Sequence, residues 1–72
     1  MTPQKIQPEF GRRFAEARQK IGMTQREAAS KAGITPVYLC QLEHGDGIPS
    51  MELAAKLADV VGITLSRLLQ NK

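Results

Sequence analysis

The sequence predicts an all-α fold built from five short helices, and three observations lead to this fold class. Apolar residues recur at helical spacing in five segments, Thr or Ser precedes and Gly follows most of these segments, and no segment alternates as a strand does. A chain of 72 residues buries only about 60% of its unfolded surface, which is enough for one core. We therefore expect one domain over residues 8–70, preceded by an N-terminal arm at residues 1–7.

The first helix is predicted over residues 8–21. Pro8 suits its first turn, because the missing N–H would have no partner there. Apolar residues then recur every three or four positions, at Phe10, Phe14, Ala17 and Ile21. Gly22 follows, where a left-handed residue commonly ends a helix.

The second helix is predicted over residues 25–32. It begins with T-Q-R-E, in which the Thr24 hydroxyl can accept the N–H of Glu27 while the Glu27 carboxylate returns to the N–H of Thr24. Gly33 can adopt a positive φ without strain, which permits a sharp change of direction after so short a helix.

The third helix is predicted over residues 36–43. Thr35 is a suitable N-cap, and Pro36 is tolerated at the first helical position. Leu39 and Leu42 supply the inward face of this helix.

The composition of residues 44–49 predicts a loop, after which Ser50 caps a fourth helix that ends at Gly62. The apolar positions of this helix are Met51, Leu53, Ala54, Leu57, Ala58 and Val61. Thr64 caps a last helix, whose apolar residues are Leu65, Leu68 and Leu69. These leucines could pack inside or form a dimer seam; we expect at least two inside, because a chain this small needs every large apolar group.

Composition excludes several classes of protein. The single cysteine, Cys40, cannot form an internal disulfide, so the chain fits a reducing compartment rather than a disulfide-stapled secreted class. No apolar run reaches the roughly 20 residues that span a bilayer, and the amino terminus lacks the apolar stretch of a signal peptide. We therefore expect a cytoplasmic protein with no membrane contact.

The net charge of +3 is unevenly distributed. Residues 1–36 carry seven Lys and Arg against three Glu, whereas residues 37–72 carry three Lys and Arg against four Asp and Glu. A positive half favours a polyanionic partner, although an ordinary solvated face has the same composition.

Residues 24–43 carry the most informative pattern. Two short helices joined by a turn that contains Gly are typical of a helix-turn-helix. The third helix has outward positions at i, i+1, i+4, i+5 and i+8, namely Pro36, Val37, Cys40, Gln41 and His44. We call these five residues the outer stripe and expect it to enter a major groove, although any amphipathic helix also has an outer face.

Two features of this segment suit DNA. Gln41 can pair with adenine N6 and N7, and the methyls of Val37 can contact a thymine methyl; the other interpretation is a solvated glutamine beside a partly exposed valine. Thr24 and Gln25 lie at the amino terminus of the second helix, where free N–H groups and the positive dipole suit a phosphate. Thr24 acts as a cap in either case.

Four motifs carry a family resemblance: R-x-x-x-G-M-T-Q-R-E-A-A, A-G-I-T-P-V-Y-L, L-E-H-G and I-P-S-M-E-L. In this order and spacing they resemble the DNA-binding domain of phage repressor and Cro proteins, the Xre-type helix-turn-helix family. The resemblance covers about residues 8–69. It implies a compact five-helix, lambda-repressor-like domain that binds DNA.

Site residues are implied by this resemblance, position by position. Arg18 and Glu43 match a structural ion pair that links the first helix to the end of the third. Gln25 matches a glutamine that meets a DNA phosphate. Positions that read base edges are matched by Pro36, Val37 and Gln41, and positions near the DNA backbone by Thr35 and Tyr38. The DNA-binding set expected here is Thr24, Gln25, Thr35, Pro36, Val37, Tyr38, Gln41 and His44.

Three positions depart from the family pattern in a way that matters. Pro36 offers no side-chain hydrogen bond, which leaves direct readout to Val37 and Gln41 and favours a contribution from DNA shape. Ala28 stands where family members often have Leu, so core volume is lost. Candidates to fill that space are Met23, Tyr38 and Met51. Asp46 lies in a loop that is often basic in the family; near a phosphate it would be repulsive, so either the loop swings away or affinity is reduced.

An enzymatic or metal-binding role is not expected. Cys40 and His44 share a helix face at i, i+4, but two ligands are too few for a closed zinc site. Nucleophilic catalysis also needs an orienting third group and a pocket. We therefore predict no catalytic residue, no metal and no cofactor.

A protein-interaction module is the rival interpretation. The same fold could act as an antitoxin that binds a toxin, or as an adaptor whose last helix meets another subunit. Antitoxins of this class commonly bind DNA as well, so this alternative modifies the function more than it replaces it. Contacts with a toxin or with RNA polymerase are left open.

The sequence as a whole predicts a sequence-specific regulator of double-stranded DNA, either a repressor or a small controller protein. It would bind an operator with two half-sites as a homodimer. The helix over residues 36–43 would read bases through Val37 and Gln41. Such a protein would act in the cytoplasm, associated with the nucleoid. The operator, the regulated genes and the choice between activation and repression stay open.

Overall fold

The computed structural model describes residues 9–69, and this range contains five α-helices and no strand. The helices are α1 (Glu9–Lys20), α2 (Gln25–Ala32), α3 (Pro36–Glu43), α4 (Met51–Val61) and α5 (Leu65–Leu69). The all-α prediction is confirmed, and the described helix ends agree with the expected ones to within one residue. The expected arm at residues 1–7 lies outside the described residues, as do positions 8 and 70 of the expected domain.

Side-chain caps start three of the helices. Thr24 Oγ1 accepts the N–H of Glu27 at 3.0 Å, and Glu27 Oε1 accepts the N–H of Thr24 at 2.9 Å, which completes the capping box. Thr35 and Ser50 each accept the N–H three residues further on, both at 3.1 Å. Each cap pairs a donor that has no carbonyl partner within its own helix.

The turn between α2 and α3 depends on Gly33, which adopts a φ of 74°. Its N–H donates to the carbonyl of Ser30 at 3.2 Å, and the N–H of Ile34 donates to the carbonyl of Ala29 at 3.0 Å. This pair of bonds closes the helix with a left-handed residue, a conformation that costs an L side chain about 1–2 kcal/mol. The turn is therefore short enough to hold α3 directly against α2.

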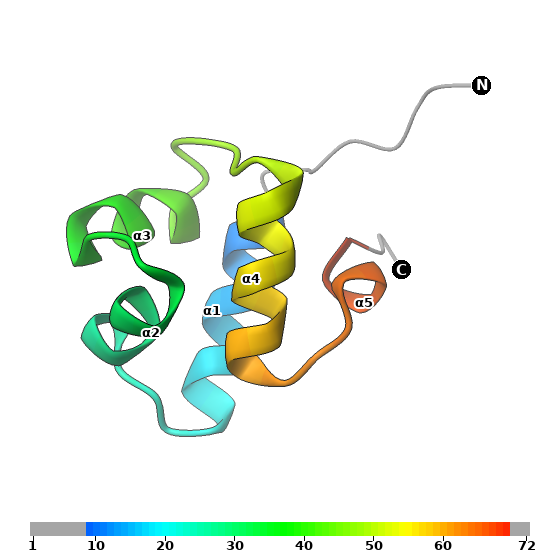
Figure 1. Cartoon of the computed structure of the whole chain (residues 1–72), viewed down its shortest axis with the longest axis horizontal. Coiled ribbons are helices and arrows are strands. Elements are labelled where there is room, and N and C mark those ends of the chain that lie inside the picture. Colours follow the sequence, from blue (N-terminus) through cyan, green and yellow to red (C-terminus); the bar gives the residue numbers. More distant parts are fainter. Residues whose placement is uncertain (1–8, 70–72) are drawn as a thin grey trace.

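The helices are arranged around a central pair, α1 and α4 (Figure 1). The α2–α3 unit packs on one side, with α2 against α4 and α3 against α1, while α5 packs on the other side. The outer surface of α3 and the helix α5 consequently lie at opposite sides of the domain (Figure 1).

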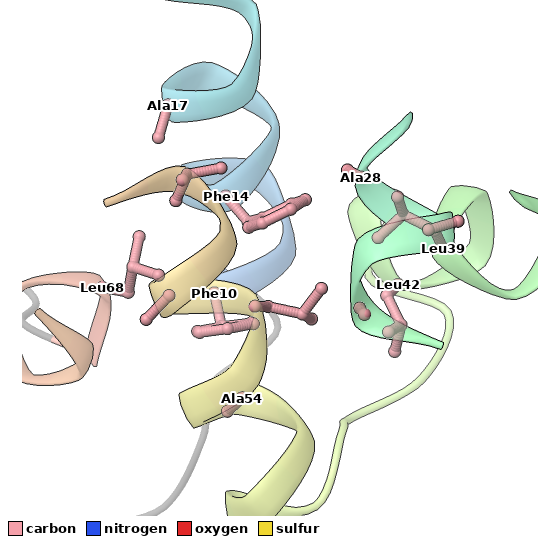
Figure 2. Packing of buried hydrophobic residues seen from close by; sticks show 13 residues of the cluster. Phe10, Phe14, Ala17, Ala28, Leu39, Leu42, Ala54 and Leu68 are labelled. Carbon is pink, nitrogen blue, oxygen red and sulfur yellow. The ribbon is translucent and has the colours of Figure 1, made fainter. Parts of the chain in front are cut away.

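The core draws on all five helices. Its buried apolar residues are Phe10, Phe14, Ala17, Ala28, Ala29, Ala32, Leu39, Leu42, Ala54, Leu57, Ala58, Val61 and Leu68. Phe10 and Phe14 are each 1% exposed, and Figure 2 shows Phe14 pointing from α1 toward Ala28 and Leu39. The ring of Phe14 therefore faces the place where the small Ala28 leaves room.

Of the three candidates to offset the small Ala28, Met23 packs against the core. Tyr38 and Met51 are 37% and 48% exposed and do not fill this space. Among the leucines of α5, Leu68 is buried, whereas Leu65 and Leu69 are half-buried and packed against the core, so the internal role is confirmed.

Ile21 was expected on the buried stripe of the first helix, but it is 55% exposed. The helix ends at Lys20, and the N–H of Met23 already donates to the carbonyl of Arg18 at 3.0 Å. The chain therefore leaves the helical path before Ile21 can complete the stripe, and the periodic spacing no longer determines its direction.

Gly11 marks the closest approach of α1 to α3. A Cβ atom built on Gly11 would overlap with the backbone carbonyl oxygen of Leu42. A side chain of any size is thus excluded here, and this contact sets how near α3 lies to the central pair. Within residues 9–69, none of the helices is both long and apolar enough to cross a bilayer.

Candidate nucleic-acid interface

The helix α3 has one face in the core and the other in solvent. Leu39 and Leu42 are 0% and 2% exposed, and they anchor the helix. Of the outer stripe, Cys40 is half-buried and the other four residues are exposed. Val37 reaches 68% exposure, which is high for an apolar side chain. The structure thus brings all five residues of the stripe onto one accessible surface.

Gln41 has a free side chain on a rigid backbone. Its carbonyl accepts the N–H of Asp46 at 2.9 Å and the N–H of His44 at 3.2 Å. Its side-chain amide forms no hydrogen bond with the other residues that the structure describes. Both the donor and the acceptor of this amide are therefore available to a base edge, which is what bidentate pairing with adenine needs.

Thr35 and Tyr38 flank the start of α3. The Thr35 hydroxyl accepts the N–H of Tyr38 at 3.1 Å, and it keeps its own proton for a further acceptor such as a phosphate oxygen. Tyr38 is 37% exposed, so its phenol lies at the surface. Both positions are compatible with the DNA-backbone role expected for them.

A hydrogen-bonded network joins α1, α2 and α3 beneath the outer stripe. Arg18 Nε lies 2.8 Å from Glu43 Oε2, Arg18 Nη2 lies 3.0 Å from Glu43 Oε1, and Arg18 Nη1 donates to the carbonyl of Met23 at 2.8 Å. The two side chains of this ion pair are only 9% and 5% exposed. The pair therefore ties the end of α1 to the last residue of α3.

Gln25 takes part in the same network, which the sequence did not indicate. Its Nε2 donates to Glu43 Oε1 at 2.8 Å. An amide nitrogen carries two protons, so the second one remains for a phosphate. Gln25 can therefore bond to Glu43 and to a phosphate at the same time. The bond to Glu43 would hold the Gln25 amide in position for the phosphate.

The amino terminus of α2 already carries a negative charge of its own. Glu27 Oε1 lies 2.9 Å from the N–H of Thr24 and 3.3 Å from the Thr24 hydroxyl. The hydroxyl of Thr24 is consequently engaged with Glu27 and is less available to DNA. Gln25 and Arg26 are the first two residues of α2, so their backbone N–H groups have no carbonyl partner within the helix. Such N–H groups at a helix amino terminus can bind an anion.

The loop after α3 is attached to the helix by its backbone. Gly45 adopts a φ of 81°, its N–H donates to the carbonyl of Leu42 at 3.1 Å, and the N–H of Asp46 donates to Gln41. The backbone of Asp46 is therefore held at the end of α3. Asp46 is exposed, two residues after His44 at the end of the outer stripe.

Arg12 belongs to this region, although sequence reasoning did not single it out. It is exposed on α1 and lines a hollow of about 270 Å³ together with Glu9, Glu43, His44 and Gly45. No local pattern could have found it, because α1 and the end of α3 meet only in the folded chain.

No metal site is found among residues 9–69, where no group of three or more His, Cys, Asp or Glu side chains is close enough to hold an ion. Cys40 Sγ lies 3.6 Å from His44 Nδ1, and these two atoms are the nearest approach to a ligand set on the outer stripe.

The geometry defines the class of protein. Two helices joined by a glycine turn, with the second helix anchored by leucines and exposing uncharged side chains, form a DNA-binding helix-turn-helix domain. More particularly, the helix-turn-helix family model matches residues 14–68, and the chain belongs to the Xre-type, phage repressor and Cro-like family of transcription regulators. This is a family of DNA-binding regulators and not of enzymes.

Similar proteins agree with this assignment. The transcriptional regulator DdrOP3 of Deinococcus deserti is 40% identical over 59 residues, covering 82% of this chain and 46% of the relative. The cryptic phage CTXphi repressor RstR of Vibrio cholerae is 36% identical over 56 residues, covering 78% and 50%. The structure of SinR in complex with DNA has a TM-score of 0.79 and 29% identity, covering 85% of this chain and 98% of the chain in that structure; SinR is a protein of Bacillus subtilis. The chain spans about half the length of the curated relatives it matches.

Proposed function

We propose that this protein is a repressor or small controller protein that recognises an operator of two related half-sites as a homodimer. In each half-site α3 enters the major groove, Gln41 and Val37 read base edges, and Gln25 and Thr35 contact phosphates. The protein would act in the cytoplasm, associated with the nucleoid.

The observation that carries this proposal is the state of Gln41. Its amide is exposed and unused, while its backbone is held by two hydrogen bonds at the end of a helix that the core anchors. Because the backbone is already fixed, pairing has to order only the side chain. A bidentate pair of this kind discriminates between bases by about 1–3 kcal/mol. SinR, which shares this fold, has been solved in complex with DNA.

A homodimer fits the placement of the helices. Because α5 and the outer surface of α3 lie at opposite sides of the domain, a second copy packed against α5 would leave α3 uncovered (Figure 1). Two copies related by a two-fold axis require half-sites about one helical turn, roughly 34 Å, apart. The exposed parts of Leu65 and Leu69 would contribute to the seam.

Selection from a random duplex library tests base reading. The parent should select a site with two-fold symmetry, and Gln41→Ala should relax the preference at one base pair in each half-site. Gln19→Ala is the matched control, because Gln19 is an exposed glutamine on α1 that lines a different surface with Ile63. If Gln41→Ala selects the parental site with full stringency, the assignment of Gln41 is wrong.

Two further measurements separate DNA binding from a protein-interaction role. Affinity should fall steeply with salt, because phosphate contacts release counterions. Sedimentation of the same sample, with and without the selected duplex, should show two chains per site. A flat salt response, or one chain per duplex of two half-sites, would contradict the proposal.

A further inference from the structure

His44 closes α3 and is the last residue of the outer stripe. It is exposed, and its backbone N–H donates to the carbonyls of Cys40 at 3.1 Å and Gln41 at 3.2 Å. The left-handed Gly45 follows directly and ends the helix. The backbone of His44 is therefore as well fixed as that of the helix itself, although the residue lies at its edge.

The side chain of His44 has a defined orientation. Its Nδ1 lies 2.8 Å from the backbone carbonyl oxygen of Cys40. A carbonyl oxygen can only accept, so Nδ1 must carry a proton. In the neutral ring, Nε2 then holds a lone pair and no proton. The neutral side chain consequently presents a hydrogen-bond acceptor to whatever lies beyond the end of α3.

The partner beyond this end of α3 would be the DNA backbone. In a helix-turn-helix, the N-terminal residues of the recognition helix contact base edges. His44 lies eight residues after Pro36, which at 1.5 Å per residue places it about 12 Å further along the helix axis. In the proposed complex, with the start of α3 at the base edges, this distance would place His44 outside the groove floor and nearer the phosphates. Phosphate oxygens only accept hydrogen bonds, so they oppose a neutral His44 and match a protonated one.

We propose that His44 is a proton-linked phosphate contact, in which each protomer takes up one proton at His44 Nε2 when the operator binds. The imidazolium donates from Nδ1 to Cys40 and from Nε2 to the phosphate. This inference rests on the proposed function, and it adds a pH dependence that the proposed function does not require.

The charged groups around His44 support a contact of this kind. The hollow beside it is lined by Glu9 and Arg12 of α1 and by Glu43 of α3. The Glu43 carboxylate already accepts bonds from Arg18 and Gln25. Exposed Arg12, which is always charged, is thus available to the same phosphate.

Three titratable groups lie in the same part of the domain as His44. Asp46 follows in the attached loop, Glu9 lies across the hollow, and Cys40 Sγ lies 3.6 Å from Nδ1. Between about pH 5.5 and 7.5, ordinary carboxylates stay ionised and ordinary thiols stay protonated, whereas histidine changes charge. The chain has a single histidine, so a variant of His44 removes the imidazole from the whole protein.

The test is the dissociation constant for the selected duplex at about pH 5.5 and pH 7.5, each over a range of salt concentrations. The parent should bind more tightly at the lower pH, by up to about tenfold per half-site for each pH unit over which one proton is taken up. The slope of log affinity against log salt should also be steeper at the lower pH by about 0.9 per half-site, because one more phosphate is neutralised.

Two variants make the result specific. His44→Gln keeps a polar side chain that does not titrate, and its affinity and salt slope should be the same at both pH values. His44→Arg keeps a positive charge at both, and at pH 7.5 it should show the steeper slope that the parent shows at about pH 5.5. His44 is exposed, and circular dichroism of each variant checks that the fold is retained.

The outcomes separate the two proposals. Specific binding that is independent of pH in the parent, or a pH dependence that persists in His44→Gln, overturns the role of His44 and leaves the proposed function intact. Absence of sequence-specific binding at both pH values overturns the proposed function and the role of His44 together.

Discussion

Replacement of Arg18 by Met removes the cation from an ion pair whose side chains are 9% and 5% exposed. The guanidinium makes two hydrogen bonds to Glu43 and one to the carbonyl of Met23, and all three are lost. Met retains much of the buried volume, so the main effect is electrostatic. The Glu43 carboxylate would keep the Gln25 amide as its partner, without a counter-charge. Breaking such a pair from one side costs about 3–5 kcal/mol.

That loss is large for this chain. At about 0.05–0.15 kcal/mol per residue, a domain of 72 residues has a free energy of unfolding of roughly 4–11 kcal/mol. Arg18→Met should therefore remove about a quarter or more of the stability. The exposed Arg12, on the same helix, is the matched control, and Arg12→Met should change the free energy of unfolding by less than about 0.5 kcal/mol.

Urea unfolding followed by circular dichroism measures these free energies in the parent, Arg18→Met, Glu43→Leu and the double variant. Most of the loss should be recovered when both charges are replaced, because an apolar pair of similar volume needs no counter-ion. A loss below about 1 kcal/mol in Arg18→Met would refute the reasoning, since it is the value of a surface pair. A double variant as unstable as the single one would show that the arginine stem, rather than its charge, is what matters.

Three other substitutions test the backbone geometry by the same unfolding assay. Gly11→Ala should destabilise by about 1–3 kcal/mol, although Ala favours a helix, because its Cβ would overlap the Leu42 carbonyl; a stabilised variant would contradict the close approach of α1 to α3. Thr24→Ala should cost about 1 kcal/mol by breaking the capping box, and an unchanged stability would show that the cap is replaced by water. Gly33→Ala should cost about 1–2 kcal/mol because its φ is 74°, whereas Gly47→Ala, with ordinary contacts only, should be close to neutral.

The helices and their ends were predictable because the interactions that define them are local. The Thr24 capping box, the Thr35 and Ser50 caps and the left-handed turn at Gly33 each join residues within five positions of one another. The prediction that Ile21 is buried was wrong because the local interactions end the helix before this residue. Its spacing continues the apolar stripe, but helical spacing predicts a direction only while the chain remains helical.

The sequence by itself determined the all-α fold, the helix-turn-helix and the composition of the outer stripe, since all of these follow from spacing and from residues that are near neighbours in the chain. The tertiary structure alone decided that Gln25 bonds to Glu43, 18 positions away, and that Gly11 must be free of a side chain. It also brought Arg12 and His44 to one hollow. Contacts of this kind depend on the angles and distances at which separate helices pack, and those are set by the filling of the shared core rather than by any local pattern.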